Sequence, residues 1–326
     1  MNHLECVTPI KNKWYWYLLA LFLCFVIANT IGSIPLIGII IVSLIKSGGD
    51  LDSISSISKM DFRAAGIDLN LGLASLLFVF AVMLIAAILL IKFIHGRTWK
   101  EVINGTNRVR WSRFFFGVFV WGIISFIFFA IGYFTEPELY TLQFQPVKFI
   151  ILVVVALIFF PFQTTCEEFL FRGYLAQGVA SWTKSRWWAL ILPSLLFGLL
   201  HSANPEIIEY GFWVMIPQYI ILGLTLGFMS IMDDGIELAM GVHFVNNLFS
   251  ALFISFKGAA LQTYALFEIS EIHPEKEILP LIISGIIILA VFACKYKWNL
   301  KIINKKVVYT NQSAVLKDIS NYGVQF

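Results

Sequence analysis

Charged side chains are scarce in this chain of 326 residues, because Asp, Glu, Lys and Arg together make up only 13% of it. A soluble domain carries roughly a quarter charged residues and just under half apolar ones, whereas 59% of this sequence is hydrophobic. A soluble globule of this length could not bury so much apolar surface, so we expect an integral membrane protein in contact with the lipid bilayer. The net charge of only +3 argues against a nucleic-acid partner.

Cysteine is also rare, and its four residues are scattered: Cys6, Cys24, Cys166 and Cys294. None of them forms a CxxC pair or has zinc-finger spacing, so the sequence gives little support for a disulfide framework. A small-residue cleavage site is missing after the first apolar stretch, which we therefore interpret as a retained anchor rather than a signal peptide.

Long uncharged runs recur along the chain and match the thickness of a bilayer. A hydrocarbon core of about 30 Å requires roughly 20 apolar residues per helix. The first run is too long for one straight span, and we expect Gly32 and Pro35 to break it into a span and an interfacial piece. The fold class predicted is all-α and polytopic, with about eight transmembrane helices. The runs are Trp14–Ile45, Leu69–Ile91, Phe114–Phe134, Phe149–Cys166, Trp187–His201, Tyr210–Met232, Leu238–Phe256 and Ile278–Cys294.

The distribution of Lys and Arg between the connecting segments predicts the orientation. Of the 23 such residues, 17 fall on the segments that share a side with both termini. Because cytoplasmic loops of membrane proteins carry the excess of Lys and Arg, both termini are expected in the cytoplasm. We expect the location to be a bacterial cell membrane.

Three regions follow from where the polar residues fall. Residues 1–145 hold three helices without chemically suggestive polar groups. Residues 146–256 hold four helices and nearly all the unusual polar residues, so we predict that this four-helix core holds the functional site. Residues 257–326 hold the last helix and a basic, cytoplasmic tail.

Several ionisable or amide side chains interrupt the apolar runs of the middle region. Such residues are expensive in a membrane and indicate a functional site by default. Residues four positions apart share a helix face, so most of these side chains lie next to a partner on the same helix. The pairs are Glu168 with Arg172, Phe197 with His201, and His243 with Asn247, while Glu167 directly precedes Glu168.

Counting along the hairpins predicts that these groups meet. If the chain turns near Lys184, Glu167 and His201 are each about 17 residues from the turn and lie at the same height. His243 is nine residues past a turn at Asp234, about 14 Å by the helical rise. The groups could converge in the cytoplasmic half of the membrane. The segment 202–209 would then be irregular chain, which is tolerated at that depth only beside protein or a cavity.

The motifs resemble those of a known family. Glu167–Arg172 reads EExxxR, Phe197–His201 reads FxxxH and His243–Asn247 reads HxxxN. Their order and spacing are similar to the CPBP family, also called Abi, of intramembrane CAAX-type prenyl endopeptidases and bacteriocin-immunity proteins. The resemblance covers about residues 165–250. It implies an eight-helix fold and cleavage of a peptide or protein substrate, which in eukaryotic relatives is a prenylated C-terminal tail.

Peptide hydrolysis needs an activated water and a site for the developing oxyanion. The interpretation we favour makes Glu167 the general base and lets His201 help to hold the water. His243 and Asn247 would donate hydrogen bonds to the oxyanion. Supporting roles fall to three residues: Glu168 and Arg172 as a structural ion pair, and Phe197 as packing.

Alternatives remain open at the level of the sequence. In a zinc version, Glu167, His201 and His243 would bind the metal and Glu168 would be the base; a firm cofactor is not implied. A thiol nucleophile at Cys166 is disfavoured, because adjacent side chains on a helix do not face each other.

Two other classes of function use the same residues differently. A non-catalytic immunity or membrane binding protein could keep the pocket without the chemistry. A transporter would usually show internal repeats or paired broken helices, which are not visible here. The sequence leaves open the substrate, the metal dependence, the oligomeric state and the role of the first three helices.

Overall fold

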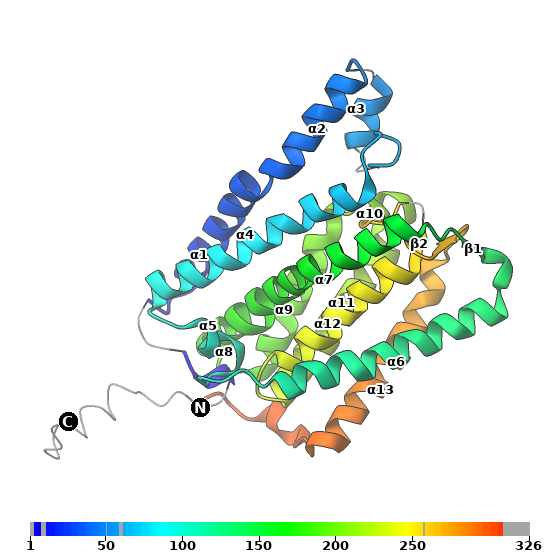
Figure 1. Cartoon of the computed structure of the whole chain (residues 1–326). Helices are drawn as coiled ribbons and strands as arrows, with labels where there is room; N and C mark the ends of the chain where they lie inside the picture. Colours follow the sequence, from blue (N-terminus) through cyan, green and yellow to red (C-terminus); the bar gives the residue numbers. More distant parts are fainter. Residues whose placement is uncertain (1–2, 8–10, 50, 59–60, 257, 309–326) are drawn as a thin grey trace, which may run out of the picture.

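The computed structural model describes residues 3–7, 11–49, 51–58, 61–256 and 258–308. Within them the chain is almost entirely helical, with three strands of three residues each, and Figure 1 shows the helices gathered into one bundle. The predicted all-α, polytopic fold class is confirmed. The last part of the expected basic tail, residues 309–326 with Lys317, lies outside the described residues.

Every predicted apolar run is helical over most of its length, although the last three residues of the run Leu238–Phe256 form a strand. The long elements are α1 (Trp14–Ile27), α2 (Ile34–Lys46), α4 (Leu69–His95), α6 (Trp111–Thr135), α7 (Pro146–Glu168), α9 (Arg186–Leu200), α11 (Phe212–Met232), α12 (Glu237–Phe253) and α13 (Pro274–Tyr296). Shorter helices connect them: η1 (His3–Glu5), η2 (Ala28–Gly32), α3 (Leu51–Ser58), α5 (Trp99–Asn104), η3 (Pro137–Leu139), η4 (Phe169–Leu175), α8 (Ala176–Thr183), η5 (His201–Ala203), α10 (Pro205–Tyr210) and η6 (Leu300–Asn304).

Within the described residues, six helical segments are long and apolar enough to cross a membrane: Trp14–Lys46, Leu69–His95, Trp111–Thr135, Pro146–Thr183, Phe212–Met232 and Pro274–Tyr296. The count of eight spans is therefore too high by this measure. The other two predicted helices, α9 and α12, have 15 and 17 residues, fewer than the roughly 20 that a span requires. Both pack closely against longer helices, α9 on α11 and α12 on α6.

The first apolar run is interrupted only briefly, and not divided into two separate pieces as predicted. The chain passes through a π-helical turn, η2, and one non-helical residue, Ser33, before α2 continues. Pro35 lies in the first turn of α2, where the proline's missing N–H is not needed for a helical hydrogen bond. The result is one segment, Trp14–Lys46, rather than a span and a separate interfacial piece.

Two glycines set the distance between α6 and α12. A Cβ added to Gly117 would lie 2.7 Å from the carbonyl oxygen of Leu238, and one added to Gly241 would collide with the carbonyl oxygen of Phe114. Small residues let membrane helices approach closely enough for their backbones to touch. This contact helps to position two predicted site residues, because α12 carries His243 and Asn247.

A small sheet closes one end of the bundle. Its order is β1 (Tyr140–Leu142), β3 (Phe267–Ile269) and β2 (Ile254–Phe256); β3 is antiparallel to β1 and parallel to β2. The strands join the segments that follow α6 and α12. The described ends of the chain meet at the opposite end of the bundle (Figure 1), where Leu4 of η1 and Ile303 of η6 share one apolar cluster.

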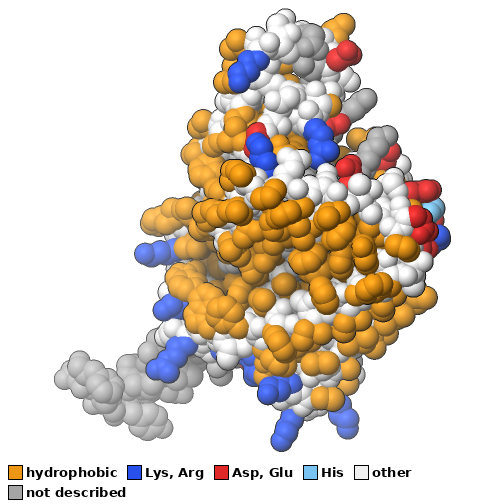
Figure 2. All heavy atoms as spheres, turned by 45° about the vertical axis from the view of Figure 1, so that its right-hand side comes forward, with side chains coloured by type: hydrophobic (Ala, Val, Ile, Leu, Met, Phe, Trp, Pro, Cys, Tyr) orange, Lys and Arg blue, Asp and Glu red, His pale blue; other side chains and the backbone are white. Residues whose placement is uncertain are grey.

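Figure 2 shows how the surface divides. Hydrophobic side chains cover a broad continuous band, many Lys and Arg side chains lie along its lower and left-hand edges with a few above it, and Asp and Glu gather at its right-hand margin. The exposed hydrophobic side chains of the protein include the aromatic residues Trp111, Phe115 and Phe119 of α6. A continuous apolar surface of this extent fits a protein surrounded by lipid rather than water.

We expect Gly241→Val to destabilise the bundle, because the added methyl groups would force α12 away from α6. Overpacking of this kind typically costs about 1–3 kcal/mol. Thermal unfolding in detergent measures the effect. The matched control is Gly38→Ala in α2, where an added Cβ meets no atom within 4 Å and better helix propensity should leave stability equal or slightly higher. Equal stability of Gly241→Val and the wild type would contradict the tight crossing.

Candidate active site

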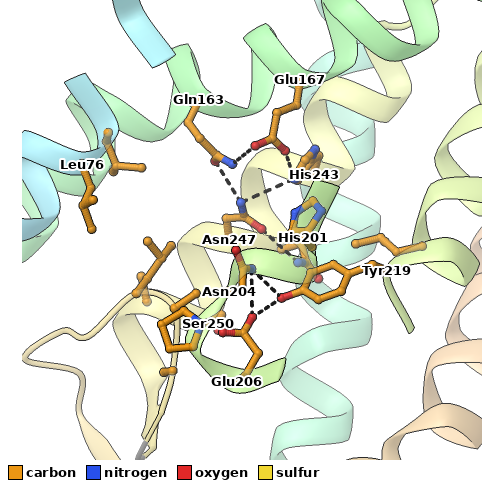
Figure 3. Close-up of a pocket in the computed structure, with 18 of the residues that line it drawn as sticks. Leu76, Gln163, Glu167, His201, Asn204, Glu206, Tyr219, His243, Asn247 and Ser250 are labelled. Atoms are coloured by element: carbon orange, nitrogen blue, oxygen red, sulfur yellow. Dashed lines mark hydrogen bonds and ion pairs between the residues drawn. The ribbon is translucent and has the colours of Figure 1, made fainter. Parts of the chain in front are cut away.

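A cavity of about 390 Å³ lies inside the bundle between α4, α7, α9, α11 and α12. Glu167, His201, His243 and Asn247 all line it, and so does Phe197. The volume is in the range of ordinary ligand pockets, about 300–1,000 Å³. The structure thus brings the four predicted site residues into one cavity (Figure 3); their chemical roles stay predictions.

The helical hairpin that carries Glu167 and His201 turns at Lys184, as the sequence predicted. α8 ends at Thr183 and α9 begins at Arg186, and Lys184 between them has a left-handed backbone with φ of 58°. The prediction of irregular chain over 202–209 is wrong. This segment lies in the two short helices η5 and α10. Pro205 is the first residue of α10, and Gly211, with φ of 93°, ends that helix.

The two adjacent glutamates both reach His243. Its Nδ1 lies 2.7 Å from Oε1 of Glu168, and its Nε2 lies 3.5 Å from Oε2 of Glu167. Because a carboxylate accepts hydrogen bonds, Nδ1 donates to Glu168, and Nε2 is directed toward Glu167. The imidazole is only 3% exposed and is held from one side by each acid.

The expected ion pair between Glu168 and Arg172 is present, with a distance of 2.9 Å between Oε1 and Nη1 and with both side chains buried. Its role is wider than predicted, because the same Oε1 holds His243. Arg172 also donates from Nη2 to the carbonyl oxygen of Gly223, 3.3 Å away, and its guanidinium lies 4.2 Å from the ring centre of Phe197.

His201 is fixed by a different set of contacts. Its Nδ1 lies 2.7 Å from the carbonyl oxygen of Phe197, so Nδ1 carries the proton and Nε2 is the basic nitrogen. Its ring stacks on Tyr219 with centroids 4.0 Å apart. Phe197, expected only to pack, touches both imidazoles, with ring centroids 4.7 Å from His201 and 6.0 Å from His243.

A directed chain of hydrogen bonds ends at Glu167. The Trp121 indole donates to Asn246, whose amide nitrogen donates to Oδ1 of Asn247; Asn247 donates to Gln163, and Gln163 donates to Oε1 of Glu167 at 2.8 Å. An indole N–H only donates and a carboxylate only accepts. The two ends therefore fix the direction of all three amides, so the Asn247 NH₂ group faces the cavity side (Figure 3).

Several residues of the site escaped the sequence interpretation. Gln163 could have been found, because it precedes Glu167 by four residues and shares its face. Asn204, Glu206 and Tyr219 line the cavity without a recognisable spacing. The first region of the chain also contributes, since α4 supplies apolar wall and α6 supplies Trp121. The wall residues from α4 are Leu76, Leu77 and Phe80.

The zinc alternative can be compared with the donors in place. Both histidines donate from Nδ1, an arrangement common among metal-binding histidines. Among the residues that the structure describes, however, no three His, Cys, Asp or Glu side chains are close enough together to hold a metal ion. The described donor set therefore does not fit a zinc ion.

The middle region matches a known family. Residues 146–249 match the family model for type II CAAX prenyl endopeptidase Rce1-like proteins, which confirms for this segment the resemblance to the CPBP family. The chain is similar to the uncharacterized protein YyaK of Bacillus subtilis (strain 168), with 32% identity over 191 residues, 58% of this chain and 63% of that protein. The match thus spans less than two thirds of the relative. No solved structure matches.

We expect Glu168→Gln and Arg172→Met to be strongly destabilising as single changes, because each strands a buried polar or charged partner. Removal of one member of a buried pair costs about 3–5 kcal/mol. The double variant should lose less than the sum of the single losses, since neither charge is then left alone. Thermal unfolding of the four proteins in detergent measures this coupling.

The control is Glu268→Gln, because the Glu268–Arg63 pair is 3.9 Å apart with both side chains about half exposed. An exposed pair contributes only about 0–1 kcal/mol. Additive losses in the double variant would show that Glu168 and Arg172 do not support one another.

Proposed function

We propose that this protein is an intramembrane endopeptidase of the CAAX type, which hydrolyses a peptide bond of a membrane-associated peptide or protein. The observation that carries the proposal is the Glu167 carboxylate, only 12% exposed, which lines one cavity together with two imidazoles inside a bundle of apolar helices. The family match at residues 146–249 supports the reaction class.

Glu167 is the general base of the proposed reaction. Gln163 holds its Oε1, whereas its Oε2 has no hydrogen-bond partner among the described residues. The carboxylate takes a proton from a water molecule, and the resulting hydroxide attacks the carbonyl carbon of the peptide bond. The basic Nε2 of His201 accepts a hydrogen bond from the same water and orients it. General-base catalysis of this kind contributes roughly 10²–10⁴-fold.

His243 and Asn247 form the oxyanion site. The Nε2 of His243 lies 3.5 Å from Oε2 of Glu167, and the Asn247 amide nitrogen lies 3.4 Å from that Nε2. Both groups stabilise the negative oxygen of the tetrahedral intermediate, and fixed donors need no reorganisation during the reaction. The intermediate collapses as the C–N bond breaks, and Glu167 returns its proton to the leaving amine.

The proposal also includes the orientation. The basic end of the bundle, which holds both described ends of the chain, would face the cytoplasm of a bacterial cell, as the excess of Lys and Arg predicts. A substrate with a lipidated tail would then share the membrane with the cavity. The main competing function is a non-catalytic immunity or binding protein that uses the same pocket.

We expect Glu167→Gln to abolish proteolysis while the protein still inserts and folds, because the amide cannot accept the proton of water. Comparative proteomics of the termini of membrane proteins, in cells with the wild type and with the variant, identifies processed ends that depend on Glu167. The loss should be at least about 10²-fold, and His243→Ala should share it. The control is Glu271→Gln, in which the acid is 67% exposed.

A phenotype that persists in a stably inserted Glu167→Gln protein would favour the non-catalytic alternative. Metal analysis of the purified protein, with activity measured before and after chelation, tests the zinc version separately. Stoichiometric zinc that is lost together with activity would replace the metal-free mechanism.

A further inference from the structure

A second acid lines the cavity at the end away from Glu167. Glu206 of α10 is 4% exposed, and Figure 3 shows it beside Asn204 and Tyr219, with Glu167 and Gln163 on the opposite side of the cavity. The proposed hydrolysis assigns no task to this carboxylate. It lies in a region where an unpaired acid is costly to keep.

The contacts of Glu206 use only one of its oxygens. Oε1 accepts hydrogen bonds from the hydroxyl group of Tyr219 and from Nδ2 of Asn204, the latter at 3.1 Å. Oε2 is covered from solvent and has no hydrogen-bond partner among the described residues. No Lys, Arg or His of the described chain forms an ion pair with this group either, in contrast to Glu168, which has Arg172 and His243.

A purely structural role explains Oε1 but not Oε2. To fix the loop between α9 and α11, a neutral side chain such as glutamine could accept the same two hydrogen bonds. A buried acceptor without a partner costs about 1–3 kcal/mol, and more when it is charged. Native structures retain few such groups, and each calls for an explanation. A cationic group brought by a ligand would remove the penalty.

We propose that Glu206 determines substrate specificity by binding a basic group of the peptide, the side chain of Lys or Arg, in this end of the cavity. The inference rests on the proposed peptidase function and deepens it. A small rotation about the last side-chain bond, which is soft in glutamate, turns Oε2 toward the cavity. Met215 and Leu261 line the same cavity, and apolar lining of this kind suits the stem of such a side chain, whose charged end reaches the polar group.

The subsite is mechanically connected to the reacting end. Tyr219 touches Glu206 with its hydroxyl group and stacks on His201 with its ring. A basic side chain bound at Glu206 therefore places the peptide near His201, with only the Tyr219 ring between Glu206 and the imidazole that would orient the water. Binding energy gained at such a distance can be used to position the scissile bond.

The test uses the full-length protein in liposomes and a set of fluorescent apolar peptides. The peptides are made in pairs that differ at one position, which carries lysine in one peptide and norleucine in the other. Norleucine has a similar straight side chain without the charge. Successive pairs place this position at different points along the peptide. Dissociation constants are measured for the wild type, Glu206→Gln and Glu209→Gln. Glu209 lies on the same short helix and is exposed, so its variant controls for the lost charge.

At one or more positions we expect lysine to bind at least tenfold more tightly than norleucine, in the wild type and in Glu209→Gln alike. In Glu206→Gln this ratio should fall close to one, while the norleucine peptide binds as before. The absence of any lysine preference, or a preference that survives in Glu206→Gln, would overturn the subsite. The norleucine peptide also reports whether the variant is folded, because it should bind to every folded protein equally.

Cleavage of the same peptides separates the two proposals. If lysine peptides bind through Glu206 but no position is hydrolysed, the peptidase function fails and the basic-group site stands. If peptides are hydrolysed at Glu167-dependent rates without regard to lysine, the peptidase function stands and the subsite fails.

Discussion

The carboxylate of Glu168 is the interaction on which the rest of the site depends. Fully buried, it accepts hydrogen bonds from Arg172 and His243, and an acid in that environment is tolerated only when it is paired. Arg172 extends the contact to Phe197 and to the backbone of Gly223. One charge thereby links the helices α7, α9, α11 and α12, and it orients the imidazole that faces Glu167.

Two further layers support this pair. The π-helical turn η4 carries Arg172, and the N-terminal His3 is buried against it, with Nε2 3.0 Å from the carbonyl oxygen of Arg172. Burial lowers the pKa of His3 to about 4, so it is neutral near pH 7 and accepts a hydrogen bond from Gln177 on Nδ1. On the other side, the chain of amides from Trp121 fixes Asn247 and Glu167. Parts of the protein far from the motifs thus fix the orientation of Arg172, Asn247 and Glu167.

The cavity has two polar ends with different character. At one end the acids share imidazoles and amides, so that each charge has partners. At the other end Glu206 has only neutral donors. The two ends of the cavity therefore offer a ligand two different polar environments, one in which the acids have ion-pair partners and one in which the acid has only neutral donors.

The sequence by itself determined the membrane class, the helices and the motif residues, because apolar length and i, i+4 spacing are local properties of a chain in lipid. The equal counts around Lys184 also predicted that Glu167 and His201 lie at the same height along their helices. Only the tertiary structure decided that Glu168 holds His243, that Trp121 begins the chain of amides, and that Glu206 lies beside Tyr219. These are contacts between side chains 13 to 125 residues apart, which packing selects and no local spacing encodes.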